Sequence, residues 1–308
     1  MKKISTLINA FTLLKSKCGK SLLTLVSEDQ NKKTTSTLKR VSMTTGILGA
    51  IAGDCIGAPY EFQPTKNKNF NLLEYAIFTD DTVMTLAVAK WLMEDPKHSH
   101  EQLISIMQEM GRRYPTAGYG SSFFRWIYLK NPKPYNSCGN GSGMRVSPCG
   151  FYAKSLKEAL DLAKISAEVT HNHPEGIKGA QAIAAAIFLA REGQSKAYIR
   201  EYISRNFGYD LSRSLDEIRP NYKYEILCQT SVPESILSYL EADTYEAAIR
   251  NAVSLGGDAD TMACMAGAIA AATPGMDMPI EIASHIKNKI LDPYLQEILY
   301  EFNEFCNQ

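Results

Sequence analysis

The sequence lacks long apolar runs and an excess of charge of either sign. Its longest apolar stretches, around 46–53 and 262–272, are far shorter than the ~20 residues that a membrane-spanning helix needs. Lys and Arg together number 33, and so do Asp and Glu. The chain as a whole therefore has no electrostatic feature that favours nucleic acid or a charged membrane surface. We expect a soluble protein that has neither of these as a partner.

A cysteine motif is also lacking. The seven cysteines are odd in number, widely scattered and never spaced as Cys-x-x-Cys. A reducing compartment fits this usage better than a disulfide framework does, so we predict a cytoplasmic location. Hydrophobic residues make up 45% of the 308 residues, which is enough for a large buried core.

The amino-terminal segment differs from the rest of the chain in charge. Residues 1–43 hold nine Lys or Arg residues and two acids. Apolar residues in 4–14 fall on one helical face, whereas 27–40 is almost wholly polar and typical of a linker. We expect 1–42 to be a basic extension and polar linker, with 4–14 either an amphipathic helix packed on the body or a loosely attached extension. An organelle transit peptide is the alternative, since 4–14 lacks acids.

From residue 43 onward, apolar residues recur at intervals of three and four, the spacing of a helix face. Such runs cover 82–93, 103–111, 155–169, 179–191, 195–206, 235–240, 244–255, 261–272 and 280–302. Alternation of the kind that indicates strands is lacking. The pattern predicts one all-α domain over 43–308, a compact orthogonal bundle of many helices.

Two of the predicted helices carry small residues at every fourth position. These rows are Gly49, Gly53 and Gly57, and Ala263, Gly267 and Ala271. Each row gives its helix a flat face that a neighbouring helix can approach closely. Glycine inside a helix costs about 1 kcal/mol relative to alanine, so tight packing or a nearby ligand must offset it. We expect Pro59 to end the first of these helices, with Glu61 in the loop beyond.

Two short acidic clusters each stand directly before a predicted helix. They are Phe-Thr-Asp-Asp-Thr at 78–82 and Gly-Gly-Asp-Ala-Asp-Thr at 256–261. Thr and Asp are preferred N-caps, and acids favour a first helical turn, so capping explains either cluster alone. Capping needs only one oxygen per helix and does not explain two Asp and a Thr twice. If the two helix starts met, they would form an all-oxygen site of the kind that Mg²⁺ prefers.

Two glycine-rich loops and a histidine segment are further candidates. In 118–122 and 138–143, glycines would let backbone N–H groups face a phosphate, although ordinary turns are the default explanation for each loop taken alone. Segment 170–175 contains His171 and His173, but a third nitrogen or sulfur ligand is missing nearby, so we do not predict zinc. His171 is the better candidate for a hydrogen-bonding residue at the rim of a pocket.

In combination, these segments resemble the ADP-ribosylglycohydrolase family, which includes the dinitrogenase reductase activating glycohydrolases. The resemblance covers about 45–272 and rests on the order Gly-Asp-x-x-Gly-x-x-x-Glu, Thr-Asp-Asp-Thr, Gly-Tyr-Gly, Gly-Asn-Gly-Ser-x-Met-Arg, Thr-His and Gly-Gly-Asp-x-Asp-Thr. It implies an all-α fold with a central cleft that holds two Mg²⁺ (or Mn²⁺) ions. It also implies a hydrolase that cleaves the N- or O-glycosidic bond between ADP-ribose and a protein side chain or small acceptor.

The resemblance further implies roles for individual residues. The metal ligands would be Thr79, Asp80, Asp81, Asp258, Asp260 and Thr261. The catalytic residues would be Glu61, Asp81 and Asp258, and Glu61 corresponds to an acid that acts near the scissile bond in part of the family. The substrate-binding residues would be Gly118, Tyr119, Gly120, Ser121, Gly139, Asn140, Gly141, Ser142, Gly143 and His171.

Two other functions are compatible with the same residues. A two-metal phosphohydrolase would cleave the diphosphate of ADP-ribose or of a nucleotide and would release AMP from ADP-ribose. A catalytically silent protein would bind ADP-ribose without turnover, which fits less well with the retention of all six implied metal ligands. The motifs concern the ADP-ribose end of the substrate, so they leave the acceptor open between arginine, serine and other groups.

Overall fold

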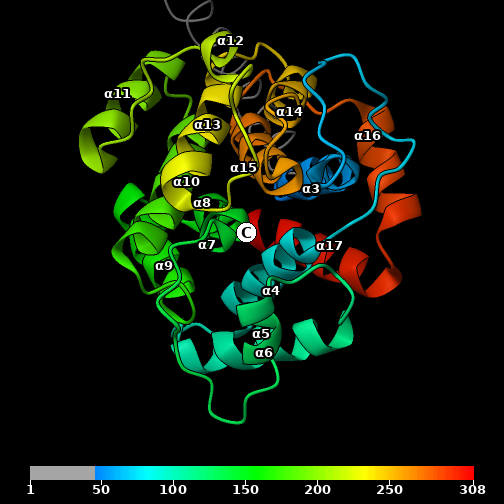
Figure 1. Cartoon of the computed structure of the whole chain (residues 1–308). Helices are drawn as coiled ribbons and strands as arrows, with labels where there is room; N and C mark the ends of the chain where they lie inside the picture. The colour runs from blue at the N-terminus through cyan, green and yellow to red at the C-terminus, as the bar shows by residue number, and fades with distance from the viewer. Residues whose placement is uncertain (1–45) are drawn as a thin grey trace, which may run out of the picture. The chain divides into compact units, whose positions relative to one another are not determined.

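Helix α15 (Ala259–Ala272) lies at the centre of the computed structural model, which describes residues 46–308. The predicted extension and linker of 1–42 lie outside the described residues. Every residue of α15 is buried, as expected for a helix that is apolar on all sides. It packs against α3, α10, α13 and α14, which surround it in Figure 1.

Fifteen α-helices and one π-helical turn form the described part of the chain. Their bounds are α3 (Leu48–Glu61), α4 (Asp80–Glu94), α5 (His100–Arg113), α6 (Ser121–Trp126), α7 (Gly141–Met144), α8 (Ser147–Tyr152), α9 (Leu156–Glu168), α10 (Pro174–Arg191), α11 (Lys196–Phe207), α12 (Leu215–Ile218), α13 (Cys228–Leu240), α14 (Tyr245–Val253), α15, α16 (Ile280–His285), η1 (Ile286–Ile290) and α17 (Pro293–Cys306). Within 46–308 the only β-type pairing is an isolated bridge between Gly139 and Leu227. The predicted all-α fold is confirmed.

Helices α3 and α15 pack with their backbones almost in contact. A Cβ atom at Gly53 would lie 2.1 Å from the carbonyl oxygen of Ala263, and one at Gly57 would lie 2.4 Å from that of Ala259. A Cβ atom on Gly267 would lie 2.4 Å from the Gly49 carbonyl oxygen. The predicted close approach along the small-residue rows is therefore confirmed, and helix packing accounts for the glycines.

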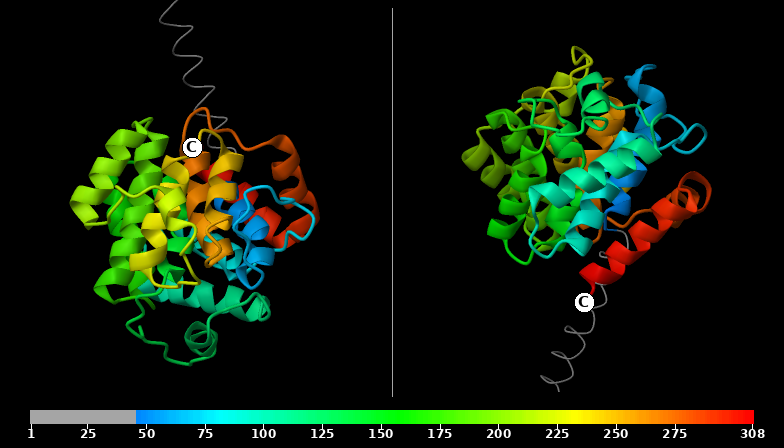
Figure 2. Two further views of the ribbon diagram at one scale, coloured as in Figure 1. Left: turned by 45° about the horizontal axis from the view of Figure 1, so that its top comes forward. Right: turned by 90° about the horizontal axis from the view of Figure 1, so that it is seen from below.

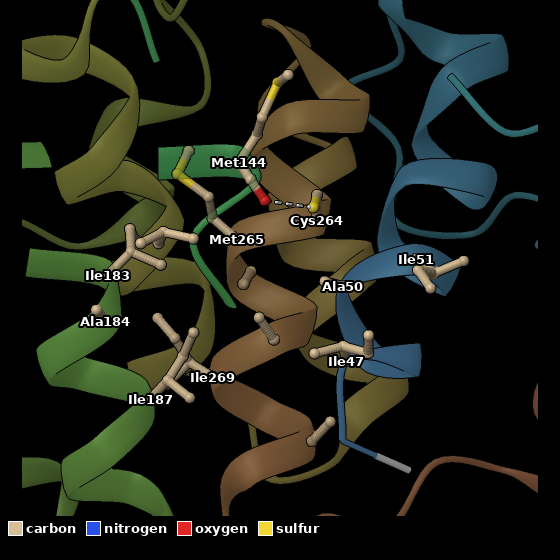
Figure 3. Packing of buried hydrophobic residues seen from close by; sticks show 14 of the residues in the cluster. Ile47, Ala50, Ile51, Met144, Ile183, Ala184, Ile187, Cys264, Met265 and Ile269 are labelled. Carbon is tan, nitrogen blue, oxygen red and sulfur yellow. Dashed lines mark hydrogen bonds between the residues drawn. The ribbon is translucent and has the colours of Figure 1, made fainter. Parts of the chain in front are cut away.

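On another side, α15 packs against α10 through larger side chains. Figure 3 shows Ile183 and Ile187 of α10 and Met265 and Ile269 of α15 lying between the two helices, and all four are buried. The Cys264 thiol donates a hydrogen bond to the carbonyl oxygen of Met144 at 3.3 Å, which ties α15 to the short helix α7. The residue row that approaches α3 and the side chains that face α10 thus hold α15 in place.

The carboxy-terminal helix α17, drawn in red in Figure 2, packs against α4. Lys90 of α4 donates a hydrogen bond to the hydroxyl of Tyr294 at 3.0 Å. The Tyr114 hydroxyl, just after α5, donates to Asp292 at 2.7 Å. The first contact ties α17 to α4, which begins with the first acidic cluster, and the second ties α17 to the end of α5.

Three predicted helix boundaries are wrong. Helix α3 continues through Pro59 to Glu61. Proline has no N–H to donate to the carbonyl of Cys55, four residues earlier, and this carbonyl accepts a hydrogen bond from the N–H of Ile77 instead. The predicted run 280–302 is broken before Pro293, where Asp292 caps a new helix. Helix α13 starts at Cys228, upstream of the predicted 235–240, and contains Pro233.

In the described residues, the helices are too short or too polar to cross a membrane. Six cysteines lie in this part of the chain, and all of them are free thiols. The cytoplasmic location remains a prediction.

Candidate metal centre

The amino-terminal ends of α4 and α15 meet at a cavity of about 520 Å³. All six predicted metal ligands line this cavity: Thr79, Asp80, Asp81, Asp258, Asp260 and Thr261. The Thr261 hydroxyl donates to Asp81 Oδ2 at 3.2 Å, which joins the two clusters across 180 residues of sequence. The expected meeting of the two helix starts is confirmed, and the role of these residues as ligands stays a prediction.

The carboxylates converge closely enough to share a cation. Oxygen atoms of Asp54, Asp81 and Asp260 lie within 4.8 Å of one another, and so do those of Glu61, Asp258 and Asp260. Asp81 Oδ1 is buried and has no hydrogen-bond partner within the described residues. A buried carboxylate oxygen without a partner is costly, and a cation would satisfy it. This set of hard oxygen donors fits Mg²⁺ or Mn²⁺.

The pKa values of these carboxyl groups reflect their crowding. Burial raises the pKa of Asp80 to about 8, and repulsion from Asp54 and Asp258 adds to the effect. Burial also raises the pKa of Glu61 to about 7. The pKa values of four further carboxyls are raised, with burial as the largest cause: Asp54, Asp81, Asp258 and Asp260. A bound cation would favour the ionised forms.

Metal-free protein is expected to lose stability as the pH rises from about 4 towards about 8. The folded pKa of Asp80 is about 8 against 3.8 for an ordinary Asp, so the folded chain binds more protons than the unfolded chain in this range. Raising the pH therefore favours unfolding. The check is the melting temperature in EDTA across this range, with Mg²⁺-loaded protein as the control, in which the decline should be smaller. A melting temperature in EDTA that climbs steadily to about pH 8 would contradict the expectation.

Asp54 is a site residue to which the motifs gave no role. It lies fully buried in α3, and its carboxylate accepts hydrogen bonds from the backbone N–H of Thr79 and of Thr82, each at 3.0 Å. It also accepts from both hydroxyls, that of Thr79 at 2.6 Å. Asp54 therefore fixes the start of α4 and leaves the lone pairs of the Thr79 hydroxyl for other partners. The available signal was an aspartate inside an otherwise apolar helix.

The capping interpretation applies to only one of the clusters. The Thr79 side chain caps α4 by accepting from the backbone N–H of Asp81 at 3.3 Å. Asp258 stands at the N-cap position of α15, but its side chain makes no capping hydrogen bond. Its Oδ2 atom instead accepts from the side-chain amide of Asn140 at 2.6 Å. Asp258 therefore occupies the N-cap position of α15 without capping it, because Asn140 of the glycine-rich loop engages this carboxylate.

Glu61 lies half-buried at the cavity, in the last turn of α3 and not in the predicted loop. The Tyr224 hydroxyl donates a hydrogen bond to Glu61 Oε1 at 2.9 Å. Burial raises the pKa of Glu61, although this hydrogen bond opposes the shift. With a pKa of about 7, Glu61 is suited to hold or release a proton near neutral pH. Tyr224 comes from an irregular segment without a motif, so its role was not predictable.

Most of the predicted substrate-binding residues line the same cavity. Those that do are Gly118, Gly120, Ser121, Gly139, Asn140, Gly141 and His171. Gly118 has a φ of +98°, which favours glycine at this position. Binding of a substrate by these residues remains a prediction.

Three of the predicted substrate-binding residues lie behind the cavity wall. The Tyr119 ring packs on Phe123 at 5.4 Å between centroids. The Ser142 hydroxyl donates to the Gly176 carbonyl at 2.7 Å. A Cβ atom at Gly143 would lie 2.9 Å from the sulfur of Met265. These contacts hold the two glycine-rich loops in place. The side chains of Tyr119 and Ser142 therefore serve the loops and do not line the cavity.

The chain is similar to proteins of known family. A family model described as ADP-ribosylglycohydrolase matches residues 35–304. Human ADP-ribosylhydrolase ARH3 is 26% identical over a region that covers 75% of this chain and 85% of that protein. ADP-ribosylarginine hydrolase Tri1 of Pseudomonas putida is also 26% identical, and the region covers 76% of this chain and 71% of that protein.

The fold is likewise similar to that of a solved structure. A chain of an ADP-ribosylglycohydrolase-related protein complex superposes with a TM-score of 0.69 at 20% sequence identity. The superposition covers 88% of this chain and 99% of that chain. At this level of identity the likeness supports the all-helical fold.

Proposed function

Because the chain belongs to the ADP-ribosylglycohydrolase family of hydrolases, we propose that it cleaves the N- or O-glycosidic bond between ADP-ribose and a protein side chain or small acceptor. The observation that carries this proposal is the cavity itself. Two acidic helix starts and two acid-free glycine-rich segments line one cavity. The carboxylates suit cations and a positively charged sugar, and the glycine-rich wall leaves backbone N–H groups accessible to phosphates.

We propose that the cavity holds Mg²⁺ or Mn²⁺. The residues that would hold the ions are Thr79, Asp80, Asp81, Asp258, Asp260 and Thr261. Bound divalent cations would supply Lewis-acid stabilisation of oxygen atoms and would lower the pKa of water. The support for this assignment is the convergence of carboxylates at Asp260 and the unpartnered oxygen of Asp81.

The residues of the chain would act on the charge and the proton of the reaction. Cleavage of a glycosidic bond develops positive charge on the sugar ring. The carboxylates around Asp260 would place negative charge beside a sugar ring bound in the cavity and so would favour the transition state. Glu61, which accepts a hydrogen bond from Tyr224 and which bound cations would keep ionised, would take a proton from the attacking water.

The test is incubation with arginine-linked and serine-linked ADP-ribosyl peptides in Mg²⁺, followed by mass spectrometry of the products. Intact ADP-ribose and unmodified peptide are expected, and the preferred peptide identifies the acceptor. Glu61→Gln is expected to slow release about 100-fold or more. Glu94→Gln, an exposed acid at the end of α4, is the matched control. Release of AMP would instead support the phosphohydrolase alternative, and binding of ADP-ribose without release from any substrate would support the silent one.

A further inference from the structure

Arg145 is a buried cation in the cavity wall that lacks an acidic partner. Its side chain is 1% exposed and lines the cavity. None of the ion pairs within 46–308 includes Arg145, and its Nε atom has no hydrogen-bond partner there. Its Nη2 atom donates to the Ser166 carbonyl and to the Thr170 hydroxyl, each at 2.8 Å. Burying an unpaired guanidinium is costly, and its two hydrogen bonds fix the positions of the groups that accept them.

The Thr170 hydroxyl connects Arg145 to His171. Thr170 Oγ1 lies 2.7 Å from His171 Nδ1. A guanidinium donates hydrogen bonds and cannot accept them, so the Thr170 hydroxyl keeps its own hydrogen, and among the described residues His171 Nδ1 is the one acceptor within hydrogen-bond distance of it. His171 Nδ1 is then the acceptor. In a neutral imidazole the proton must therefore sit on Nε2.

The surroundings of His171 favour the neutral ring. Burial lowers the pKa of His171 well below its ordinary value, and the charge of Arg145 lowers it further. Tyr135 is the ring that packs beside it, with 6.0 Å between centroids. Neither neighbour supplies a negative charge that would stabilise an imidazolium.

The Nε2 atom of His171 faces the second glycine-rich loop and the cavity. A Cβ atom at Gly141 would lie 3.1 Å from Nε2, and one at Gly139 would lie 3.8 Å away. His171 lines the cavity, and in the described part of the chain its Nε2 atom has no hydrogen-bond partner. The absence of side chains at Gly139 and Gly141 therefore keeps this N–H available to a ligand.

We propose that Arg145 and Thr170 are positioning residues that hold His171 in the neutral Nε2–H tautomer, so that the ring donates a hydrogen bond to a ligand oxygen in the cavity. The ligand's identity as ADP-ribose rests on the proposed function. The tautomer rests only on the hydrogen bonds from Arg145 through Thr170 to His171. With the opposite tautomer, a nitrogen lone pair would face the anionic ligand and repel it.

The first test reads the tautomer in the full chain without ligand. Two-bond ¹H–¹⁵N NMR spectra distinguish the two ring nitrogens, and the spectrum of His171→Gln identifies the His171 signals. The wild type is expected to show Nε2–H at about pH 7, and so is Thr170→Ser, which keeps the hydroxyl. Thr170→Val should populate the Nδ1–H form. A wild-type Nδ1–H tautomer or imidazolium would overturn the proposal, and these wild-type spectra decide even if Thr170→Val fails to fold.

The second test measures ADP-ribose binding by calorimetry. Thr170→Val is expected to weaken binding about tenfold, and Thr170→Ser to change it by less than about twofold. Thr85→Val is the matched control, because Thr85 is equally buried and its hydroxyl contacts the Met144 carbonyl and not His171. An unchanged affinity in Thr170→Val would overturn the proposal. Failure of the proposed function would give a different result. No ADP-ribose would be released from any substrate, while the NMR spectra of the wild type would still show the Nε2–H tautomer.

Discussion

Removal of divalent cations is expected to slow ADP-ribose release by about 1,000-fold or more, and added Mg²⁺ is expected to restore it. The reason is the density of carboxylates around Asp260, which cannot all remain ionised without a cation. The measurement is the rate of release after EDTA treatment, with metal content verified by elemental analysis. Full activity in protein shown to be metal-free would contradict the proposed metal centre.

Single Asp→Asn changes separate metal binding from a purely structural role of these acids. Asparagine keeps the size of aspartate and one of its acceptor oxygens, so an acid without a role in metal binding would leave the affinity for Mg²⁺ unchanged when it is replaced. Asp80→Asn and Asp258→Asn are instead expected to lose Mg²⁺ binding in calorimetry while the helical circular dichroism persists. Asp292→Asn is the control, since Asp292 caps α17 and does not line the cavity. If the first two variants unfold while the control folds, the acids are structural.

Gly53→Ala is expected to destabilise the protein by about 3 kcal/mol or more, or to prevent folding. The added methyl group would lie 2.1 Å from the Ala263 carbonyl oxygen, and neither backbone can move without separating α3 from α15. Helix propensity alone predicts the opposite sign, a gain of about 1 kcal/mol for Gly→Ala. The measurement is the free energy of unfolding in urea. Activity should fall as well, because α3 carries Asp54 and Glu61.

Gly120→Ala is the matched control for this change. Nothing lies within 4 Å of the position that its Cβ would take, and its φ of −56° suits any residue. We expect its stability to change by less than about 1 kcal/mol. A Gly53→Ala variant as stable as this control would show that the α3 and α15 backbones can separate at little cost.

Predictions from the sequence were accurate where the cause is local. Apolar periodicity located α4, α9, α14 and α15, because one helical face must be buried wherever the helix packs. The ends of helices were less predictable. Pro59 did not end α3, because the carbonyl that the proline leaves free finds a partner in Ile77, in a segment that local pattern does not place.

Residue types and their spacing were enough to predict the all-helical class, the two acidic helix starts, the glycine-rich segments and the family. Each of these depends on residues that are close together in the sequence, so it can be predicted before the fold is known. The folded structure was needed to show three contacts: Asp54 accepts a hydrogen bond at the start of α4, Asn140 donates to Asp258, and Tyr224 donates to Glu61. Each of these depends on two side chains from separate segments meeting at hydrogen-bond distance. The sequence indicates that a buried polar group needs a hydrogen-bond partner, and the packing of the chain determines which residue is that partner.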